Sequence, residues 1–356
     1  MKSLGKFPDP FWTEITGQPA ALRRAAEGLS EQHRELDAVF QRGLRAPLVF
    51  TGMGASYDAC YAPVTLLAER GRTATMVDAA ELVHFRRPTL TPGTLIVVVS
   101  QSGESAEVVR LMDALEGGEG PFIVSVTNGR ENLVARRADI SFDTRAGREV
   151  GPSTATFAAT MVVLAGIAEV LSGKPGSEVA AAVRTFTEQA AKVTEGLLAR
   201  APALSAELLS WASGHGSFAV LGRGTARAAS EMAALLLKEA ARLPAEALET
   251  GQFRHGPLEL AGPELAVAIV ATEESTAELD LALAAELVET GAAVLVVGPD
   301  GDVPEGITHV SFPRLGRHVA PVVAAVPFQL LGWRLAADRG LTPGLLTRAS
   351  KVTTHE

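Results

Sequence analysis

The stretch Leu95–Ser105 reads LIVVVSQSGES and decides the fold of this 356-residue chain. Its first five residues, Leu95–Val99, are apolar and mostly β-branched, which predicts a buried strand. The strand pattern stops at serines set around one glycine, and the amphipathic segment Ala106–Leu115 follows at once. The stretch therefore predicts a strand, a tight loop and a helix, which together form the repeating unit of a parallel α/β sheet.

The same loop predicts an anion site. Ser100, Ser102 and Ser105 place hydroxyl groups beside the unbonded N–H groups of a helix N-terminus, where the helix dipole is positive. Such a site suits a phosphate held by neutral donors. The alternative is an ordinary serine N-cap, since serine is a favoured capping residue. Three hydroxyls within six residues favour anion binding.

Strand and helix signals alternate along the whole chain. In the first half, strands are predicted at residues 47–50, 73–77, 95–99, 122–126 and, more weakly, 139–142, and a long alanine-rich helix at 153–171. A helical connector follows over 178–201 and onward to about 213. In the second half, strands are predicted at 218–221, 265–270, 293–297 and 309–312, and helices at 226–242, 277–290 and 323–339. This alternation predicts parallel sheets with helices on both faces.

The two halves can be aligned with one another. Val49–Ala55 matches Ala219–Thr225, and Val97–Ser100 matches Ile269–Thr272. Ser125–Asn128 likewise matches Val296–Pro299. We therefore expect an α/β protein made of two tandem flavodoxin-like units. The expected organisation is a helical segment at 1–35, a first unit at 36–178, a connector at 179–213, a second unit at 214–342 and a tail at 343–356.

The two halves differ at the serine loop. The second half has Thr272-Glu273-Glu274-Ser275-Thr276 in its place, and two carboxylates would repel a phosphate. We therefore expect one anion site per chain, in the first half.

Composition excludes several classes of protein. The net charge of −9 argues against nucleic acid or an anionic membrane as the main partner. Cys60 is the single cysteine, so no disulfide framework or cysteine-based metal site is expected. Residues 1–10 lack the apolar core of a signal peptide, and no apolar run reaches the length of a membrane span. We expect a cytoplasmic protein.

No cofactor or metal is expected. The turns Gly52-Met53-Gly54 and Gly222-Arg223-Gly224 each lack the third glycine of a dinucleotide fingerprint. They are interpreted as glycine-assisted turns between a strand and a helix. No two histidines have a metal-ligand spacing such as His-Glu-x-x-His.

Glu239 is a candidate general base. It lies on an apolar face of the predicted helix 226–242, four residues after Leu235 and three after Leu236. A carboxylate in such a place tends to have a raised pKa, which suits a base that works near neutral pH. A buried ion pair with an arginine is the equally weighted alternative.

His255 and Lys351 are further candidates. His255 precedes Gly256-Pro257, which fixes the shape of the loop and favours a positioned proton-transfer residue. Lys351 lies in an irregular C-terminal stretch, where a solvated lysine is the default interpretation.

Several motifs together resemble the double-SIS (sugar isomerase) family, from about residue 20 to the last residue. The motifs are Gly54–Ser56, Ser100–Ser105, Glu149–Thr154, Leu237–Glu239, Gly251–Pro257 and Ala349–Thr353. They occur in the family's order, and the likeness is strongest to the isomerase half of glucosamine-6-phosphate synthase and its stand-alone relatives, among them deaminases and deglycases.

The resemblance implies a role for each matching residue. Glu239 would move a proton between C1 and C2 of the sugar, His255 would assist ring opening from the neighbouring subunit of a homodimer, and Lys351 would take part in ring opening, with a Schiff base as one route. The resemblance also implies a set of substrate-binding residues: the sugar phosphate would be bound by Ser100, Gln101, Ser102 and Ser105, and the sugar by Ser56 and Ser153.

The chain departs from the family pattern in three positions and one domain. Leu236 replaces a lysine, Ala55 a threonine and Ala155 a lysine. Fewer than about 50 residues precede the first predicted strand and none near the N-terminus is cysteine, so no glutamine-cleaving nucleophile is expected.

The first hypothesis is therefore an enzyme that interconverts glucosamine 6-phosphate with fructose 6-phosphate and ammonia. A fructosamine-6-phosphate deglycase is the alternative within enzymes. A non-catalytic sugar-phosphate sensor is the alternative outside them, and the short N-terminal stretch leaves no room for the DNA-binding domain that such sensors carry.

Overall fold

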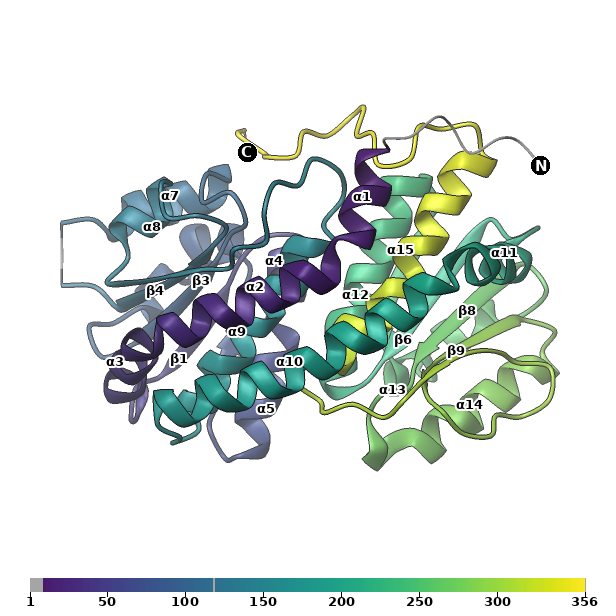
Figure 1. Cartoon of the computed structure of the whole chain (residues 1–356), viewed down its shortest axis with the longest axis horizontal. Coiled ribbons are helices and arrows are strands. Elements are labelled where there is room, and N and C mark those ends of the chain that lie inside the picture. Colours follow the sequence, from purple (N-terminus) through teal and green to yellow (C-terminus); the bar gives the residue numbers. More distant parts are fainter. Residues whose placement is uncertain (1–8, 118, 356) are drawn as a thin grey trace. The chain divides into compact units, whose positions relative to one another are not determined.

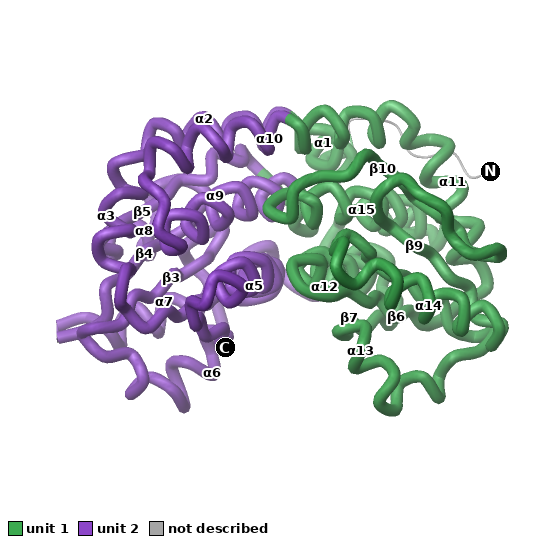
Figure 2. Tube along the Cα trace, turned by 90° about the horizontal axis from the view of Figure 1, so that it is seen from below, with its two compact units in different colours: residues 1–19, 149–154, 189–347 green, residues 20–148, 155–188, 348–356 purple. Residues whose placement is uncertain are grey.

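The computed structural model describes residues 9–117 and 119–355, and these residues form two compact units. Unit 1 consists of residues 1–19, 149–154 and 189–347, and unit 2 of residues 20–148, 155–188 and 348–356 (Figure 2). Each unit is therefore built from three separate stretches of chain. The expectation that residues 1–10 carry no signal peptide falls almost entirely outside the described residues.

Unit 2 is built on a parallel five-stranded sheet, called sheet A, with the order β2-β1-β3-β4-β5. Its strands β1, β3 and β4 are labelled in Figure 1. Leu48 of β1 pairs with Leu95 of β3, and Leu95 in turn pairs with Phe122 of β4. The strands are β1 (Leu48–Thr51), β2 (Ala74–Met76), β3 (Leu95–Val99), β4 (Phe122–Thr127) and β5 (Ile140–Asp143). All five residues of β3 are buried, as a central strand covered on both faces requires.

Alternate residues of the strands in sheet A face opposite layers of helix. Val49, Ile96 and Val98 pack with Leu111 of α7 and Val134 of α8 in one core cluster. On the other side α9, whose residues are all buried, contacts α3, α5 and β4. The helices are α2 (Gln18–Glu31), α3 (His33–Gly43), α4 (Ala55–Asp58), α5 (Tyr61–Glu69), α6 (Ala79–Glu81), α7 (Ala106–Leu115), α8 (Leu133–Arg137) and α9 (Ala155–Leu171). A π-turn, η1 (Leu82–Arg86), and a 3-10 turn, η2 (Arg87–Thr89), follow α6.

Unit 1 contains a second parallel sheet, sheet B, with the order β10-β9-β8-β6-β7. With strands numbered within each sheet, both sheets have the flavodoxin-like order 2-1-3-4-5. The strands are β6 (Ser217–Gly222), β7 (Ala245–Glu249), β8 (Leu265–Val270), β9 (Ala293–Pro299) and β10 (Thr308–Phe312). The α/β fold with two parallel sheets is confirmed.

Sheet B is also covered on both faces. Leu221, Ile269 and Val296 pack with Leu283 and Leu287 of α14. Elsewhere α12 contacts β6 and α15, and α15 contacts α11. The helices are α1 (Pro10–Thr16), α10 (Gly176–Ala199), which begins in unit 2, α11 (Ala201–Ala212), α12 (Arg227–Leu236), α13 (Thr250–Phe253), α14 (Ala277–Glu289) and α15 (Ala320–Asp338). The short turns are η3 (Gly224–Ala226), η4 (Leu237–Ala241), η5 (Pro257–Leu260) and η6 (Glu274–Thr276).

Among the described helices, α15 alone is long and apolar enough to cross a membrane by length and composition. Of its apolar window, 89% is buried, as in the core helix of a folded domain. Gln329 and Arg334 interrupt the apolar run.

Two expectations need correction. The sequence predicted no strand at β7, which adds a fifth strand at the edge of sheet B. The single helix expected over 226–242 is instead a 3-10 turn, the α-helix α12 and a π-turn.

Candidate functional site

The serine loop lies at the carboxyl end of β3 and is folded on itself by two hydroxyl acceptors. The Ser100 Oγ, on a residue that is 3% exposed, accepts a hydrogen bond from the Gly103 N–H at 3.1 Å. The Ser102 Oγ accepts from the Glu104 N–H at 3.1 Å. Ser102, Ser105 and Gln101 are half-buried. The loop therefore has a fixed backbone and side chains that solvent still reaches.

Gly103 is required by the geometry of this loop. Its φ is +64°, in the left-handed region, and a Cβ there would lie 1.9 Å from the Asn132 Oδ1. Asn132 in turn accepts from the Ala135 N–H at 2.9 Å and so caps α8. The loop and the start of α8 are consequently packed against one another.

Ser105 occupies the N-cap position of α7, yet its side chain makes no capping hydrogen bond. Its backbone is extended, with φ −63° and ψ 136°, as an N-cap requires. The ordinary-cap interpretation is thus wrong for Ser105. The Ser105 hydroxyl therefore does not bond the first-turn N–H groups, which have no acceptor within the helix.

The C-terminal tail reaches the same helix end. The Ala106 N–H donates to the Thr353 carbonyl at 2.9 Å, and both residues belong to unit 2. Lys351, two residues earlier, is half-buried and has an interaction partner, which differs from the solvated lysine of the default interpretation. The structure therefore brings the tail motif and the serine loop together.

Ser56 lies at the same edge of sheet A. It belongs to α4, which directly follows β1, and β1 pairs with β3. A Cβ on Gly52 would lie 2.8 Å from the Val99 carbonyl oxygen and 3.0 Å from the Ser56 carbonyl carbon. Only a glycine lets the turn after β1 approach the end of β3 this closely.

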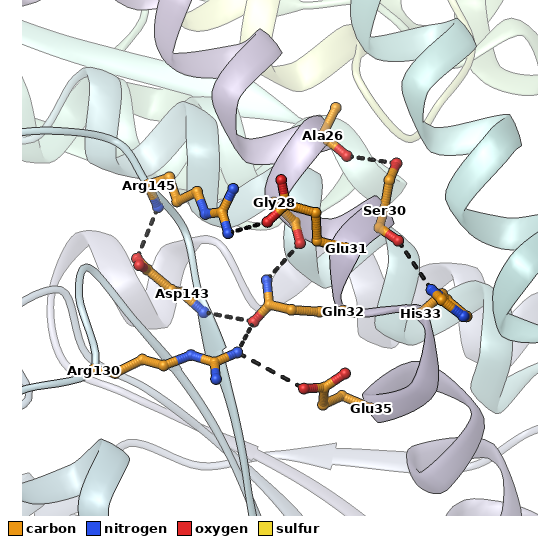
Figure 3. A network of polar contacts seen from close by, with 10 residues as sticks. All are labelled: Ala26, Gly28, Ser30, Glu31, Gln32, His33, Glu35, Arg130, Asp143 and Arg145. Atoms are coloured by element: carbon orange, nitrogen blue, oxygen red, sulfur yellow. Dashed lines mark hydrogen bonds and ion pairs between the residues drawn. The ribbon is translucent and has the colours of Figure 1, made fainter.

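A polar network holds the next loops of this edge (Figure 3). Gln32, which is 4% exposed, donates to the Gly28 carbonyl at 2.8 Å and accepts from Arg130 at 2.5 Å and the Asp143 N–H at 3.2 Å. Arg145, with φ +52°, pairs with Glu31 at 2.5 Å. This pairing lowers the pKa of Glu31. The junction of α2 and α3 thereby fixes the loops after β4 and β5.

Asn128 joins that network to the serine loop. Its N–H donates to the Gln101 carbonyl at 3.0 Å, and its side-chain amide donates to the Gly147 carbonyl at 2.7 Å. Neither Asn128 nor Gln32 was predicted, because their partners are distant in sequence.

The other candidates belong to unit 1. Glu239 lies in the π-turn η4, where the chain leaves α-helical register, and is half-buried rather than enclosed by apolar neighbours. The turn ends at Arg242, which has a left-handed backbone with φ +54°. π-turns occur often at functional sites, because they re-aim one side chain relative to the helix.

His255 and Ser153 differ in exposure. His255 is exposed and follows α13, and its N–H donates to the Gln252 carbonyl at 3.0 Å. Gly256 follows with φ +116°. Ser153 is half-buried in the loop before α9.

In sheet B, a protein carboxylate occupies the turn that corresponds to the glycine turn after β1. Glu273, which is 3% exposed, accepts from the Thr225 N–H at 2.7 Å and the Thr225 hydroxyl at 2.6 Å, and it pairs with Arg317. Beside it, Arg223 bonds the buried Asp280 at 2.8 Å. Burial raises the pKa of Asp280 although Arg223 opposes the shift. The two Thr225 donors of this edge are thus engaged by a carboxylate of the protein itself.

These features define a class: an α/β protein with flavodoxin-like sheets and a serine-rich loop before a helix N-terminus. Residues 46–169 and 214–302 match the family model described as the SIS domain. The chain belongs to the SIS domain family.

Curated relatives extend the comparison. The chain is 31% identical to a glutamine–fructose-6-phosphate aminotransferase [isomerizing] of Aeropyrum pernix over 99% of this chain and 58% of that protein. It is 28% identical to the enzyme of that name from Pyrococcus horikoshii, over 100% of this chain and 59% of that protein. The chain thus spans under two thirds of the length of these relatives.

Solved structures share the fold. The C-terminal domain of glucosamine-fructose-6-phosphate aminotransferase from Francisella tularensis superposes with a TM-score of 0.83 at 22% identity, over 96% of this chain and 98% of that one. Glucosamine-6-phosphate deaminase from Thermotoga maritima superposes with a TM-score of 0.71 at 22% identity, over 96% of this chain and 99% of that one.

Proposed function

We propose that this protein is a phosphosugar aldose–ketose isomerase and deaminase that interconverts glucosamine 6-phosphate with fructose 6-phosphate and ammonia. The observation that carries the proposal is the serine loop before α7, where the Ser105 hydroxyl makes no capping bond. The Ala106 N–H donates to the Thr353 carbonyl, and the N–H groups that follow it in the first turn have no acceptor within the helix. A dianionic phosphate at that place is stabilised by the helix dipole and by neutral donors.

The reaction needs one proton moved between neighbouring carbons. In the deaminating direction the ring opens to the C1 aldehyde, and a base takes the C2 proton to give an enaminol. Return of the proton to C1 gives a C2 imine, which water hydrolyses to the ketone and ammonia. We assign the base to Glu239, whose half-buried carboxylate is accessible enough to exchange a proton. Lys351 and His255 are assigned to ring opening, where a cation and a proton carrier are needed.

The names of the relatives support an amino-sugar phosphate. The curated relatives are named for fructose 6-phosphate, and one structural neighbour is named a glucosamine-6-phosphate deaminase. Another structural neighbour is named a tagatose-6-phosphate ketose/aldose isomerase. A ketose–aldose isomerisation needs the same proton transfer between C1 and C2, on a sugar that carries no amine.

The decisive experiment measures ammonia release and ketose formation from glucosamine 6-phosphate. Galactosamine 6-phosphate and 6-phosphorylated fructosyl amino acids are run beside it. We expect turnover on glucosamine 6-phosphate, with loss of about 10²-fold or more in kcat for Glu239→Gln, because the general base is removed. Glu246→Gln is the matched control, since Glu246 is exposed on the edge strand β7. Turnover on the fructosyl adducts alone would replace this proposal with a deglycase.

We further propose a homodimer in which His255 serves the neighbouring subunit, which agrees with its exposed position. Mixing inactive Glu239→Gln chains with inactive His255→Ala chains should restore part of the activity, because one site of each mixed dimer then holds both intact groups. The measurement is turnover of refolded mixtures, with heterodimers verified by differently tagged chains. Heterodimers that form and stay inactive would rule out a shared site.

A further inference from the structure

We propose that Glu14 is a positioning residue, which fixes the loop of residues 149–154 so that Ser153 can contact the sugar of the substrate. The inference rests on the proposed function, and all of the contacts that carry it lie within unit 1. Nothing in the sequence motifs pointed to Glu14, because it lies more than 130 residues before the loop.

The Glu14 carboxylate is bonded to the backbone of this loop. It is 9% exposed, and its Oε1 accepts from the Val150 N–H at 2.5 Å. The Gly151 N–H points at both carboxylate oxygens, at 3.2 and 3.4 Å. Hydrogen bonds to a charged acceptor are about twice as strong as neutral ones, so this carboxylate is the main polar anchor at the start of the loop.

A second carboxylate closes the other end of the loop. The Glu149 Oε1 accepts from the Thr154 N–H at 2.9 Å and from the Thr154 hydroxyl at 3.0 Å. Glu149 is itself 6% exposed. Ser153 therefore sits in a short arch whose two ends are each bonded to a buried carboxylate.

Glu14 can act as an anchor because its own helix is firmly placed. Asp9 caps α1 through the Phe11 N–H at 3.0 Å and accepts from the Trp333 Nε1 at 2.7 Å. The rings of Trp12 and Trp333 lie 4.5 Å apart. These contacts attach α1 to α15, beside which it lies (Figure 1).

The backbone of the loop approaches Glu14 and Phe11 closely at Gly151. A Cβ on Gly151 would lie 3.0 Å from the Glu14 Oε2 and 3.2 Å from the Phe11 ring. Phe11 also contacts the chain that leads to the tail, since a Cβ on Gly344 would lie 2.5 Å from the Phe11 Cβ. The single helix α1 thus contacts both the Ser153 loop and the chain at Gly344, all within unit 1.

The test separates sugar contact from phosphate contact. Fructose 6-phosphate and inorganic phosphate are titrated calorimetrically into the unsubstituted protein, Glu14→Gln and Gly151→Ala. We expect Glu14→Gln to weaken fructose 6-phosphate binding about tenfold, which corresponds to about 1.4 kcal/mol, and to leave inorganic phosphate binding unchanged. Gly151→Ala should act in the same direction while keeping the carboxylate. Equal losses for both ligands would overturn the inference.

Amide hydrogen exchange gives a readout that needs no ligand. Residues 149–154 should exchange faster in Glu14→Gln, because the backbone anchor is weakened. Asp37→Asn is the matched control: its carboxylate accepts from the Gly176 N–H at 2.7 Å and holds a different loop. Unchanged exchange at 149–154 in Glu14→Gln would overturn the anchoring. If the unsubstituted protein binds inorganic phosphate but no sugar phosphate, the proposed function has failed, and exchange alone decides whether Glu14 holds the loop.

Discussion

Gly103 allows the serine loop to adopt its folded backbone conformation. Its φ is +64°, and a Cβ on this residue would lie 1.9 Å from the Asn132 Oδ1, so it has neither the conformation nor the space for a side chain. We expect Gly103→Ala to lower the free energy of unfolding by about 2 kcal/mol or more, because left-handed strain and a clash add together. Urea unfolding measures the loss.

Gly71→Ala is the control for backbone strain alone. Gly71 also has a left-handed φ, +72°, but nothing lies within 4 Å of its Cβ position. Its substitution should cost less than that of Gly103. Equal costs would show that the Asn132 contact contributes nothing.

His309 gives a pH dependence at the residue scale. It lies on β10 and lines a cavity of about 130 Å³ in unit 1, and burial lowers its pKa from the ordinary 6.5, although Asp300 and the Pro299 backbone oppose the shift. The unfolded chain therefore binds the proton more tightly than the folded one. The stability contribution is complete above pH 6.5 and is lost as pH falls below it.

Urea unfolding at pH 7.5 and pH 5.5 tests this sign. The decrease in unfolding free energy between the two pH values should be smaller in His309→Gln than in the unsubstituted protein. An identical decrease in both proteins would contradict a lowered pKa.

At the scale of single residues, local sequence predicts some contacts and misses others. The hydroxyls of Ser100–Ser105 are close in sequence, so their common loop followed from the pattern of strand and helix. Gln32 and Glu14 hold backbone groups more than 90 residues away, and no local pattern encodes such a partner. The half-buried state of Glu239 was also missed, because helical periodicity does not allow for a π-turn.

Among the elements, α7 allows capping and ligand binding to be separated. Ser105→Ala should cost well under the ~1 kcal/mol that loss of a capping side chain normally costs, because the Ser105 hydroxyl makes no capping bond. It should nevertheless weaken phosphate binding. Urea unfolding and calorimetry give the two values.

Asp78→Ala is the control for that comparison. The Asp78 Oδ1 accepts from the Glu81 N–H at 2.8 Å and caps α6. Its removal should show the ordinary loss of about 1 kcal/mol with phosphate binding unchanged. A Ser105→Ala protein that is destabilised as much as Asp78→Ala would restore the ordinary-cap interpretation.

Which elements were predicted depends on how clearly they are patterned. The buried strands β3 and β8 lie at the predicted residues, since continuous apolar runs mark them clearly. The edge strand β7 was missed because Glu246 and Glu249 interrupt its apolar pattern. Edge strands often carry such charges, which discourage pairing with another chain.

Across the whole molecule, two sheets of the same strand order differ in how their carboxyl edges are filled. Glu273 takes the donors of Thr225 in sheet B, whereas the serine loop of sheet A has no such carboxylate among its described partners. We expect calorimetry to give one phosphate bound per chain. Two equivalent sites would contradict this assignment.

Glu273→Gln tests the same asymmetry through stability. The Glu273 side chain is 4% exposed and that of its partner Arg317 is 33% exposed. We expect a loss of about 1–2 kcal/mol in the free energy of unfolding, because the hydrogen bonds from the Thr225 N–H and hydroxyl lose their charged acceptor, while solvent still reaches Arg317. Glu274→Gln is the control, since the Glu274 side chain is 81% exposed and its pair with Arg314 contributes little.

The bond from the Ala106 N–H to the Thr353 carbonyl has a consequence for the order of events during synthesis. Ala106 leaves the ribosome early, but its acceptor is translated only after every strand of sheet B. Domains generally fold from the N-terminus as the chain grows. All strands of sheet A are therefore translated long before Thr353, the acceptor for the first N–H group of α7. In a growing polypeptide the start of α7 therefore lacks this acceptor until residues that follow sheet B in the chain have been translated.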